Sequence, residues 1–264
     1  ATGCPSVRPM RSSCLTWTPA NGWRGDESDA VARVDLILAF GSGEALEEGS
    51  ALRALQDAHE GALIAAVSTA GEIAGHSVSD GSIAALLLSF DATTVRGVQV
   101  AIGDGESSDA IAARLVASIP LAGLSHLFLF SDGLHVNGSA LAAGVSAALP
   151  PQVAVTGGLA GDGDRFRETR VGLGTEIRPR QVVAIALYGS ALRVGYGSVG
   201  GWDAFGPERL ITRSHGNVLH SLDDEPALAL YKRYLGEAAA GLPASALLFP
   251  LALLRGDGTP ALVR

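Results

Sequence analysis

The residues best suited to chemistry lie in four short loops, each of which follows an apolar segment. The loops span residues 41–44, 68–73, 131–138 and 157–163, and they mix hydroxyl, carboxylate and amide side chains with glycine. Such loops suit a small polar, zwitterionic or anionic ligand better than an apolar one, because glycine lets backbone N–H groups approach a ligand closely. The candidate ligand-binding residues are Ser68, Thr69, Gly71, Glu72, Ser131, Asp132, Asn137, Gly158, Gly161 and Asp162.

A serine hydrolase is an alternative reading of the same loops. Ser68 or Ser131 could combine with His76 or His135 and with Asp132, because a catalytic triad is assembled in space rather than in sequence. The segment 75–79 (GHSVS) lacks the final glycine of the nucleophile elbow GxSxG, so the motif itself does not favour a hydrolase.

Cofactor motifs give little support for a bound nucleotide or metal. The GxGxxG match at 195–200 is followed by GWDAFGP, whose proline and glycines oppose the helix that a dinucleotide site needs. The only lysine, Lys232, is not part of a P-loop. The six histidines show no metal-ligand spacing, and His59 is expected in the core. We therefore expect no metal and no cofactor, with haem as an alternative, because one axial histidine in an apolar pocket suffices.

The composition is that of a folded protein with a large core. The chain has 264 residues, of which 47% are hydrophobic and 17% charged. The net charge of −8 argues against nucleic-acid binding. Two cysteines, Cys4 and Cys14, cannot form a disulfide framework. The N-terminus lacks the apolar core of a signal peptide, and prolines interrupt the longest apolar run, 238–254, so we expect a cytoplasmic protein without membrane insertion.

The order of apolar segments predicts an α/β fold with an internal duplication. Strands are expected at 34–40, 62–67, 82–90 and 95–102, and again at 126–130, 152–158, 181–189 and 192–199. Helical patterns follow the first strand of each set, and a helix at 108–119 links the sets. We expect internally duplicated strand–helix–strand units that form mixed sheets flanked by helices. The alternative is that any α/β protein yields such an order.

The duplication has a consequence for function, because two related copies would turn equivalent loops toward one crevice. In open α/β sheets, ligands bind beyond the carboxyl ends of the strands. We expect a loose segment at 1–30, the duplicated domain at 31–215 and a further domain that starts at 216–264. The apolar stretch 246–254 (ALLFPLALL) makes self-association an expectation as well.

Several motifs together resemble a known family. The segment 67–73 (VSTAGEI) resembles the STAGE signature of the FIST N-terminal domain. Similar matches occur at 131–133 with 137–138, at 157–158 with 160–162, and at 195–198 leading to Trp202 and 205–207. The segments 216–217, 222–223, 226–228 and 231–236 look like the opening of an incomplete FIST C-terminal domain. The chain departs from the family at Ala66 and Val67, where Gly-Cys is common, and in lacking a long first helix.

This resemblance implies a sensory domain of bacterial signal transduction rather than an enzyme. FIST domains are thought to bind small molecules, with amino acids proposed, and to pass the event to a signalling output. No kinase or cyclase segment accompanies the domain here, so the output is expected to be a separate protein, a further C-terminal part or an unknown one. Some family members bind haem and sense nitric oxide, so the resemblance also implies a haem-based gas sensor as an alternative.

Overall fold

The computed structural model describes residues 10–25, 33–197, 206–254 and 260–263. The chain divides into two compact units, Ala1–Gly195 and Tyr196–Arg264, and each is described by itself.

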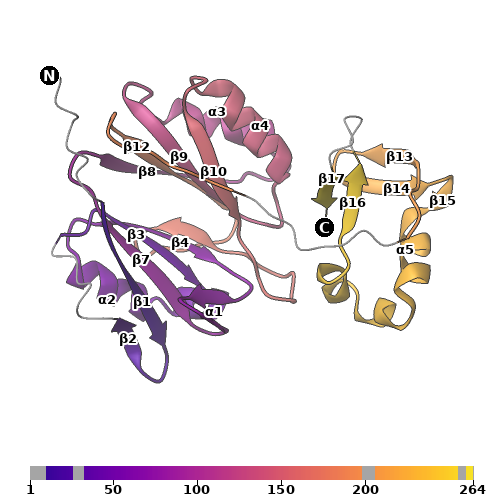
Figure 1. Cartoon of the computed structure of the whole chain (residues 1–264), viewed down its shortest axis with the longest axis horizontal. Coiled ribbons are helices and arrows are strands. Elements are labelled where there is room, and N and C mark those ends of the chain that lie inside the picture. Colours follow the sequence, from indigo (N-terminus) through magenta and orange to yellow (C-terminus); the bar gives the residue numbers. More distant parts are fainter. Residues whose placement is uncertain (1–9, 26–32, 198–205, 255–259, 264) are drawn as a thin grey trace, which may run out of the picture. The chain divides into compact units, whose positions relative to one another are not determined.

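The first unit is built on two β-sheets (Figure 1). One has six strands in the order β11-β4-β3-β7-β1-β2, and the other has four in the order β10-β9-β12-β8. The strands of the first sheet are β1 (Arg11–Thr18), β2 (Gly22–Gly25), β3 (Leu36–Gly41), β4 (Leu63–Ser68), β7 (Ile83–Ser89) and β11 (Val171–Leu173). Those of the second are β8 (Thr94–Ala101), β9 (Leu124–Ser131), β10 (Ala154–Leu159) and β12 (Gln181–Tyr188).

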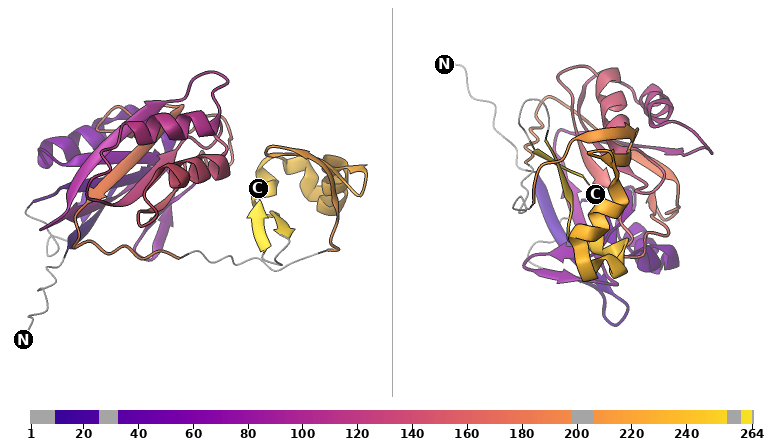
Figure 2. Two further views of the ribbon diagram at one scale, coloured as in Figure 1. Left: turned by 90° about the horizontal axis from the view of Figure 1, so that it is seen from above. Right: turned by 90° about the vertical axis from the view of Figure 1, so that its right-hand side faces the viewer.

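The two sheets pack face to face, and helices cover their outer faces (Figures 1 and 2). Apolar side chains from both sheets form the central cluster, which includes Leu36, Val67, Phe130 and Ile185. On the outer face of the first sheet lie α1 (Gly43–Glu48) and α2 (Ser50–Ala58), and on that of the second lie α3 (Ser108–Ala117) and α4 (Gly138–Ala148). The unit therefore has four layers with three apolar interfaces.

The expected mixed sheets flanked by helices are confirmed. The two sheets share one pattern of strand directions, seen in β4-β3-β7-β1 and in β10-β9-β12-β8. In each of these runs the first two strands are parallel, and the next two neighbouring pairs are antiparallel. Strand order by itself does not establish a common origin of the halves, so the internal duplication stays a prediction.

The N-terminal part of the unit differs from the expectation of a loose segment over 1–30. Strand β1 inserts between β7 and β2 and pairs with both. Trp17 faces Trp23 across the β1–β2 pair, and the indole N–H of Trp23 donates to the carbonyl of Ala51 on α2 at 2.9 Å. These aromatic contacts order a segment whose Ser, Pro and Gly content suggested a loop.

Two further expectations are corrected. The strand expected at 192–199 is not formed over the described residues 192–197. His59 is a half-buried residue that ends α2 rather than a core side chain. Strand β11 pairs with β4 of the first sheet, and Val171 also exchanges two backbone hydrogen bonds with Arg178. A separate hairpin forms from β5 (Glu72–Ala74) and β6 (Ser77–Ser79).

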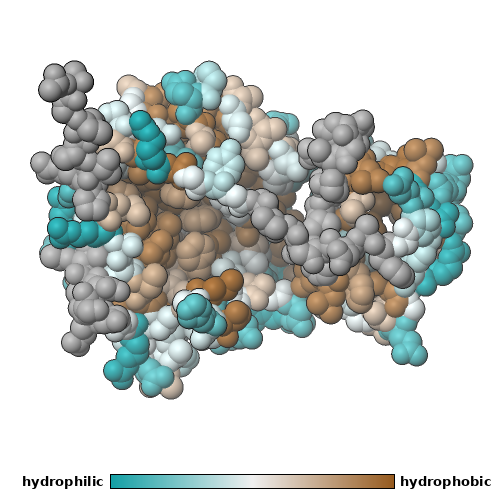
Figure 3. Space-filling view, viewed as in Figure 1, coloured by the Kyte–Doolittle hydropathy of each residue, from teal (hydrophilic) through white to brown (hydrophobic). Residues whose placement is uncertain are grey.

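The second unit is smaller and poorly buried. It contains β13 (Ile211–His215), β14 (Val218–Leu222), β15 (Glu225–Pro226), α5 (Ala227–Leu235), the 3-10 helices η2 (Gly236–Gly241) and η3 (Ala244–Leu247), β16 (Leu251–Leu254) and β17 (Pro260–Val263). Of its described apolar side chains only Ala227 and Leu230 are buried, while residues such as Leu228 and Leu248 are exposed. Hydrophobic residues accordingly show at the surface of this unit (Figure 3). Among the described residues, no helix is both long and apolar enough to cross a membrane.

Candidate functional site

The four loops singled out in the sequence follow the carboxyl ends of two parallel strand pairs. Gly41 lies beside Ser68 where β3 and β4 end, and Ser131 lies beside Leu159 where β9 and β10 end. Loops from both sheets then meet. We call this end of the first unit the loop edge, defined by residues 41–44, 68–73, 131–138 and 157–163.

Ser68 makes the contact between the two sheets at the loop edge. Its buried hydroxyl donates to the carbonyl of Gly161 at 2.8 Å and accepts from the N–H of Arg170 at 2.9 Å. The Gly161 N–H in turn donates to the Ser68 carbonyl at 2.8 Å. A Cβ at Gly161 would lie 3.1 Å from the backbone nitrogen of Ala70, so the loops are in direct contact at this point.

Glu72 fixes the turn that follows Ser68. One oxygen of its buried carboxylate accepts from the Thr69 hydroxyl at 2.8 Å, and the other accepts from the Ser82 hydroxyl at 2.7 Å. Gly71 has φ +135°, a conformation that residues with a side chain rarely adopt. The turn is therefore rigid, and it carries the β5–β6 hairpin.

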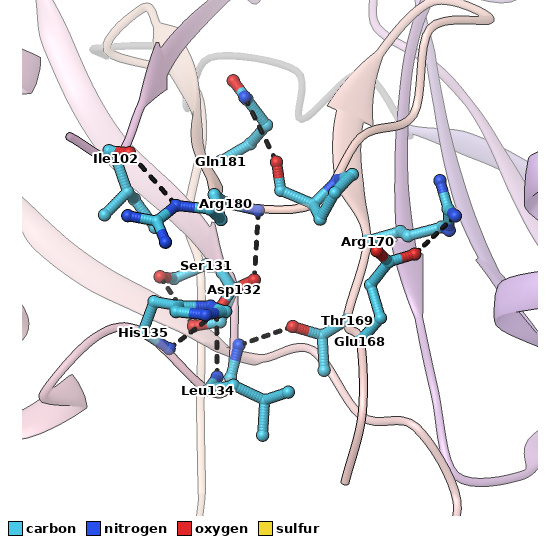
Figure 4. A network of polar contacts seen from close by, with 12 residues as sticks. Ile102, Ser131, Asp132, Leu134, His135, Glu168, Thr169, Arg170, Arg180 and Gln181 are labelled. Carbon is cyan, nitrogen blue, oxygen red and sulfur yellow. Dashed lines mark hydrogen bonds and ion pairs between the residues drawn. The ribbon is translucent and has the colours of Figure 1, made fainter. Parts of the chain in front are cut away.

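Asp132 is the centre of a second polar network (Figure 4). One oxygen accepts from the N–H groups of Leu134 and His135, both at 2.8 Å, and from Nδ1 of His135 at 3.0 Å. The other accepts from the N–H of Arg180 at 3.1 Å. Burial alone would raise the pKa of Asp132, but these hydrogen bonds hold the pKa below its usual value. The neighbouring Ser131 hydroxyl donates to the Asp132 carbonyl.

The side chains of Asn137 and Asp162 also accept hydrogen bonds from backbone N–H groups. The side chain of Asn137 accepts from the Ala140 N–H at 3.0 Å and caps α4. Asp162 accepts from the N–H groups of Arg167 and Glu168 and from the guanidinium of Arg165. Burial opposes ionisation of Asp162, yet these partners lower its pKa.

The structure thus brings the predicted polar residues to one edge, but it bonds them chiefly to the protein itself. Gly158 is the open member of the set: it is exposed, and a Cβ there would meet no atom within 4 Å. Whether the ten residues contact a ligand stays a prediction.

Charged side chains that sequence reasoning missed occupy the outside of the loop edge. Arg170 forms ion pairs with Glu47 of α1, at 2.8 Å, and with Glu168. Arg165 joins Asp162 to Glu44 of α1, at 2.7 and 2.6 Å. The signal that could have found them is the concentration of arginines at 165, 167, 170, 178 and 180 in a chain of net charge −8.

The geometry gives the hydrolase alternative no support. Ser68 and Ser131 both donate their hydroxyls to carbonyl oxygens rather than to histidine. Asp132 does hold His135, but no serine hydroxyl bonds to that histidine in the described hydrogen bonds.

The described residues also give no support to a metal or haem site. Within the described ranges no three His, Cys, Asp or Glu side chains gather as a metal site would require. A haem ligand would need a free nitrogen on an apolar wall. The one buried histidine of the described part is His126. Its Nε2 forms a hydrogen bond with the Thr156 hydroxyl at 2.8 Å, and the hollow beside it also contains Ser125, Gln152 and Arg193. These residues do not fit a haem.

Comparison with known proteins places this geometry in a family. A sequence model of the FIST N domain matches residues 35–225. The chain belongs to the FIST N domain family. The match begins one residue before β3 and runs through the first unit to the start of β15 in the second. No curated protein matches the chain. FIST N domains are sensory domains of signal transduction and are generally non-catalytic.

Proposed function

We propose that this FIST N domain binds a small zwitterionic or anionic molecule at the loop edge, with amino acids as the first candidates. Binding would then be signalled to a separate output protein. The observation that carries the proposal is the joining of loops from the two sheets through Ser68 and Gly161, with charged side chains of both signs around the joint. Ligands of α/β folds are commonly bound beyond the carboxyl ends of the strands, which is where these loops lie.

The ion pairs at the loop edge supply the chemistry for a zwitterion. A guanidinium binds a carboxylate through two parallel hydrogen bonds, and a carboxylate accepts from an ammonium group. The Nη2 atom of Arg170 pairs with both Glu47 and Glu168, so a bound amino acid would exchange these partners, with its carboxylate on Arg170 and its ammonium group on a glutamate. Such an exchange replaces ion pairs with equivalent ones and costs little desolvation.

The predicted residues divide into two roles under this proposal. Ser68, Glu72, Asp132 and Asp162 are buried and hold the loops, so they position the groups that meet the ligand. Gly158 and the loop backbone lie at the surface and contact it directly.

A link from binding to signalling would run through α1. Arg165 and Arg170 reach Glu44 and Glu47 on this helix of six residues, so a ligand that competes for the arginines changes what holds α1. A ligand shifts an equilibrium only through such differential contacts.

A thermal-shift screen of the whole chain tests the proposal. The panel contains the common amino acids and small carboxylates, and a ligand at 100 times its Kd stabilises the folded state by about 2.7 kcal/mol. We expect Arg170→Gln to abolish the shift. Arg178→Gln is the matched control, because Arg178 forms an exposed ion pair with Glu176. This variant should keep the thermal shift. A folded protein that responds to no member of the panel, or an Arg170→Gln variant that responds fully, would refute the proposal.

A further inference from the structure

The β5–β6 hairpin turns its polar side chains toward the protein. The carboxylate of Glu72 is buried, and it accepts hydrogen bonds from the hydroxyls of Thr69 and Ser82. Ser79 stands opposite Glu72 in the strand pairing, and its hydroxyl lies 2.9 Å from the Ser82 hydroxyl. The inner face of this hairpin is therefore fastened by hydrogen bonds rather than by apolar packing.

Two apolar side chains form the outer face of the hairpin. Ile73 and Val78 are 75% and 72% exposed, the highest values among the large apolar side chains of the described first unit. They stand directly opposite each other in the strand pairing, so they lie on one face with their Cβ atoms about 5 Å apart. A surface hairpin ordinarily places apolar side chains inward and polar ones outward. The alternation is inverted here, and packing within the unit does not explain it.

The outer pair is held in a fixed position. Gly75, with φ +59°, forms the turn between the two strands. At the other end of the hairpin, the Glu72 carboxylate accepts from both the N–H and the hydroxyl of Ser82, the residue before β7. An ordered projection of this kind loses little conformational entropy when it binds a partner.

The small size of the outer pair decides between two kinds of partner. A stable protein interface takes about 800 Å² from each side, which is far more than two side chains provide. The pair therefore cannot by itself hold two copies of this chain together. Two protruding apolar side chains suit the centre of an interface with a different protein, where they fill a pocket and exclude water.

The charge of the chain favours a basic partner. The net charge is −8, and the exposed Asp80 directly follows the hairpin. Anionic lipid headgroups would repel such a chain, whereas a basic protein surface would attract it and raise the rate of association.

One short segment connects the hairpin to the joint between the two sheets. Ser68 bonds to Gly161, and a Cβ at Gly161 would lie 3.1 Å from the nitrogen of Ala70. The Thr69 hydroxyl then donates to the Glu72 carboxylate at 2.8 Å, where the hairpin begins. A change at this joint therefore reaches the hairpin directly.

We propose that Ile73 and Val78 are the anchor through which the chain binds its output protein, a basic protein with an apolar pocket. The inference rests on the proposed function for the existence of an output protein, and it names the surface on which that protein docks. Binding buries the two side chains in the pocket, while the hydrogen bonds of Glu72 keep the hairpin in place.

Photo-cross-linking of the full chain in the cells that naturally produce it tests the anchor. Ile73 or Val78 is replaced by the photo-reactive amino acid p-benzoylphenylalanine, and the exposed Asp91 is replaced in the same way as a control. We expect both hairpin positions to become joined to the same basic protein on irradiation, and position 91 to give no such adduct.

Titration of the isolated partner with the full chain then measures the contribution of the pair. The double variant Ile73→Ser with Val78→Ser should bind about 10-fold more weakly or worse, because it removes both anchor side chains. Met10→Ser is the matched control, because it removes another exposed apolar side chain of the first unit, and it should bind as the parent does. Circular dichroism checks that all variants are folded.

Three results would overturn the anchor: no protein adduct at positions 73 and 78 of a folded chain, the same adduct at position 91, or a double variant that binds as tightly as the parent. Adducts to lipid alone would assign the pair to a membrane instead. The test needs no amino acid, so a chain that cross-links as expected but shows no thermal shift keeps the anchor and loses the proposed ligand.

Discussion

Ser68 and Gly161 exchange two hydrogen bonds, hydroxyl to carbonyl and N–H to carbonyl, each 2.8 Å long, and so tie the end of one sheet to the end of the other. They lie 93 residues apart in the chain. The pair explains why loops of separate sheets form one edge.

Replacing Ser68 by alanine should destabilise the fold by about 2–4 kcal/mol, because it leaves a part-buried carbonyl and a part-buried N–H without their partner. The Gly161 carbonyl and the Arg170 N–H are the two groups concerned. Urea unfolding followed by circular dichroism measures the loss. Ser77→Ala, at an exposed position of β6, is the control and should change stability by less than about 0.5 kcal/mol. Equal effects of the two substitutions would contradict a stabilising role of the Ser68 hydrogen bonds.

Two neighbouring glycines should respond in opposite ways to alanine. At Gly157, φ is +155° and a Cβ would lie 1.8 Å from the Leu129 carbonyl oxygen, so Gly157→Ala should cost about 2–4 kcal/mol. At Gly158 a Cβ meets nothing within 4 Å, so Gly158→Ala should leave stability within about 0.5 kcal/mol of the parent. Thermal unfolding of both variants makes the comparison. If Gly158→Ala keeps the fold but loses the amino-acid response, Gly158 belongs to the ligand site.

Asp132 should make stability depend on pH in the acid range. Its pKa is lowered in the folded state, so its contribution is present above the unfolded-state value of about 3.9 and is lost as pH falls through the folded-state pKa. We expect Asp132→Asn to be about 2–4 kcal/mol less stable than the parent at pH 7, with the gap narrowing below about pH 4. Urea unfolding at a series of pH values measures it. Asp91→Asn, at an exposed position, should show no such gap, and a gap for Asp132→Asn that did not vary with pH would argue against an ionised Asp132.

The exposed apolar side chains of the second unit should drive self-association. Leu228 and Leu248 are 59% and 64% exposed, and the described part of the unit buries only two apolar side chains. We propose that the full chain associates at micromolar concentration and that Leu228→Ser with Leu248→Ser shifts it toward monomer. Sedimentation velocity at several concentrations measures the shift. Val78→Ser removes an even more exposed apolar side chain from the first unit, and it should have no effect if the second unit carries the contact. A parent chain that is monomeric throughout the concentration series would disprove the proposal.

The sequence alone determined most strands of the two sheets, the loops and the family. Strands such as β3 and β7 are nearly continuous apolar runs that reach a glycine or a polar turn, and a pattern of that kind depends on neighbouring residues only. The motif at 67–73 and those that follow it likewise placed the chain among FIST N domains before any contact was known. The gathering of Ser68, Asp132 and Asp162 at one edge followed from the rule that parallel strands end together.

Tertiary structure decided what those residues do. Ser68, Asp132 and Asp162 were predicted to contact a ligand, yet each is bonded to backbone groups, and the partner of Ser68 comes from a distant segment. A hydrogen-bond partner so far along the chain leaves no trace in local sequence. The same holds for β1, which is ordered by the contacts of Trp17 and Trp23. Burial and the identity of the partner are properties of the packed chain, and they separate residues that build a site from residues that bind in it.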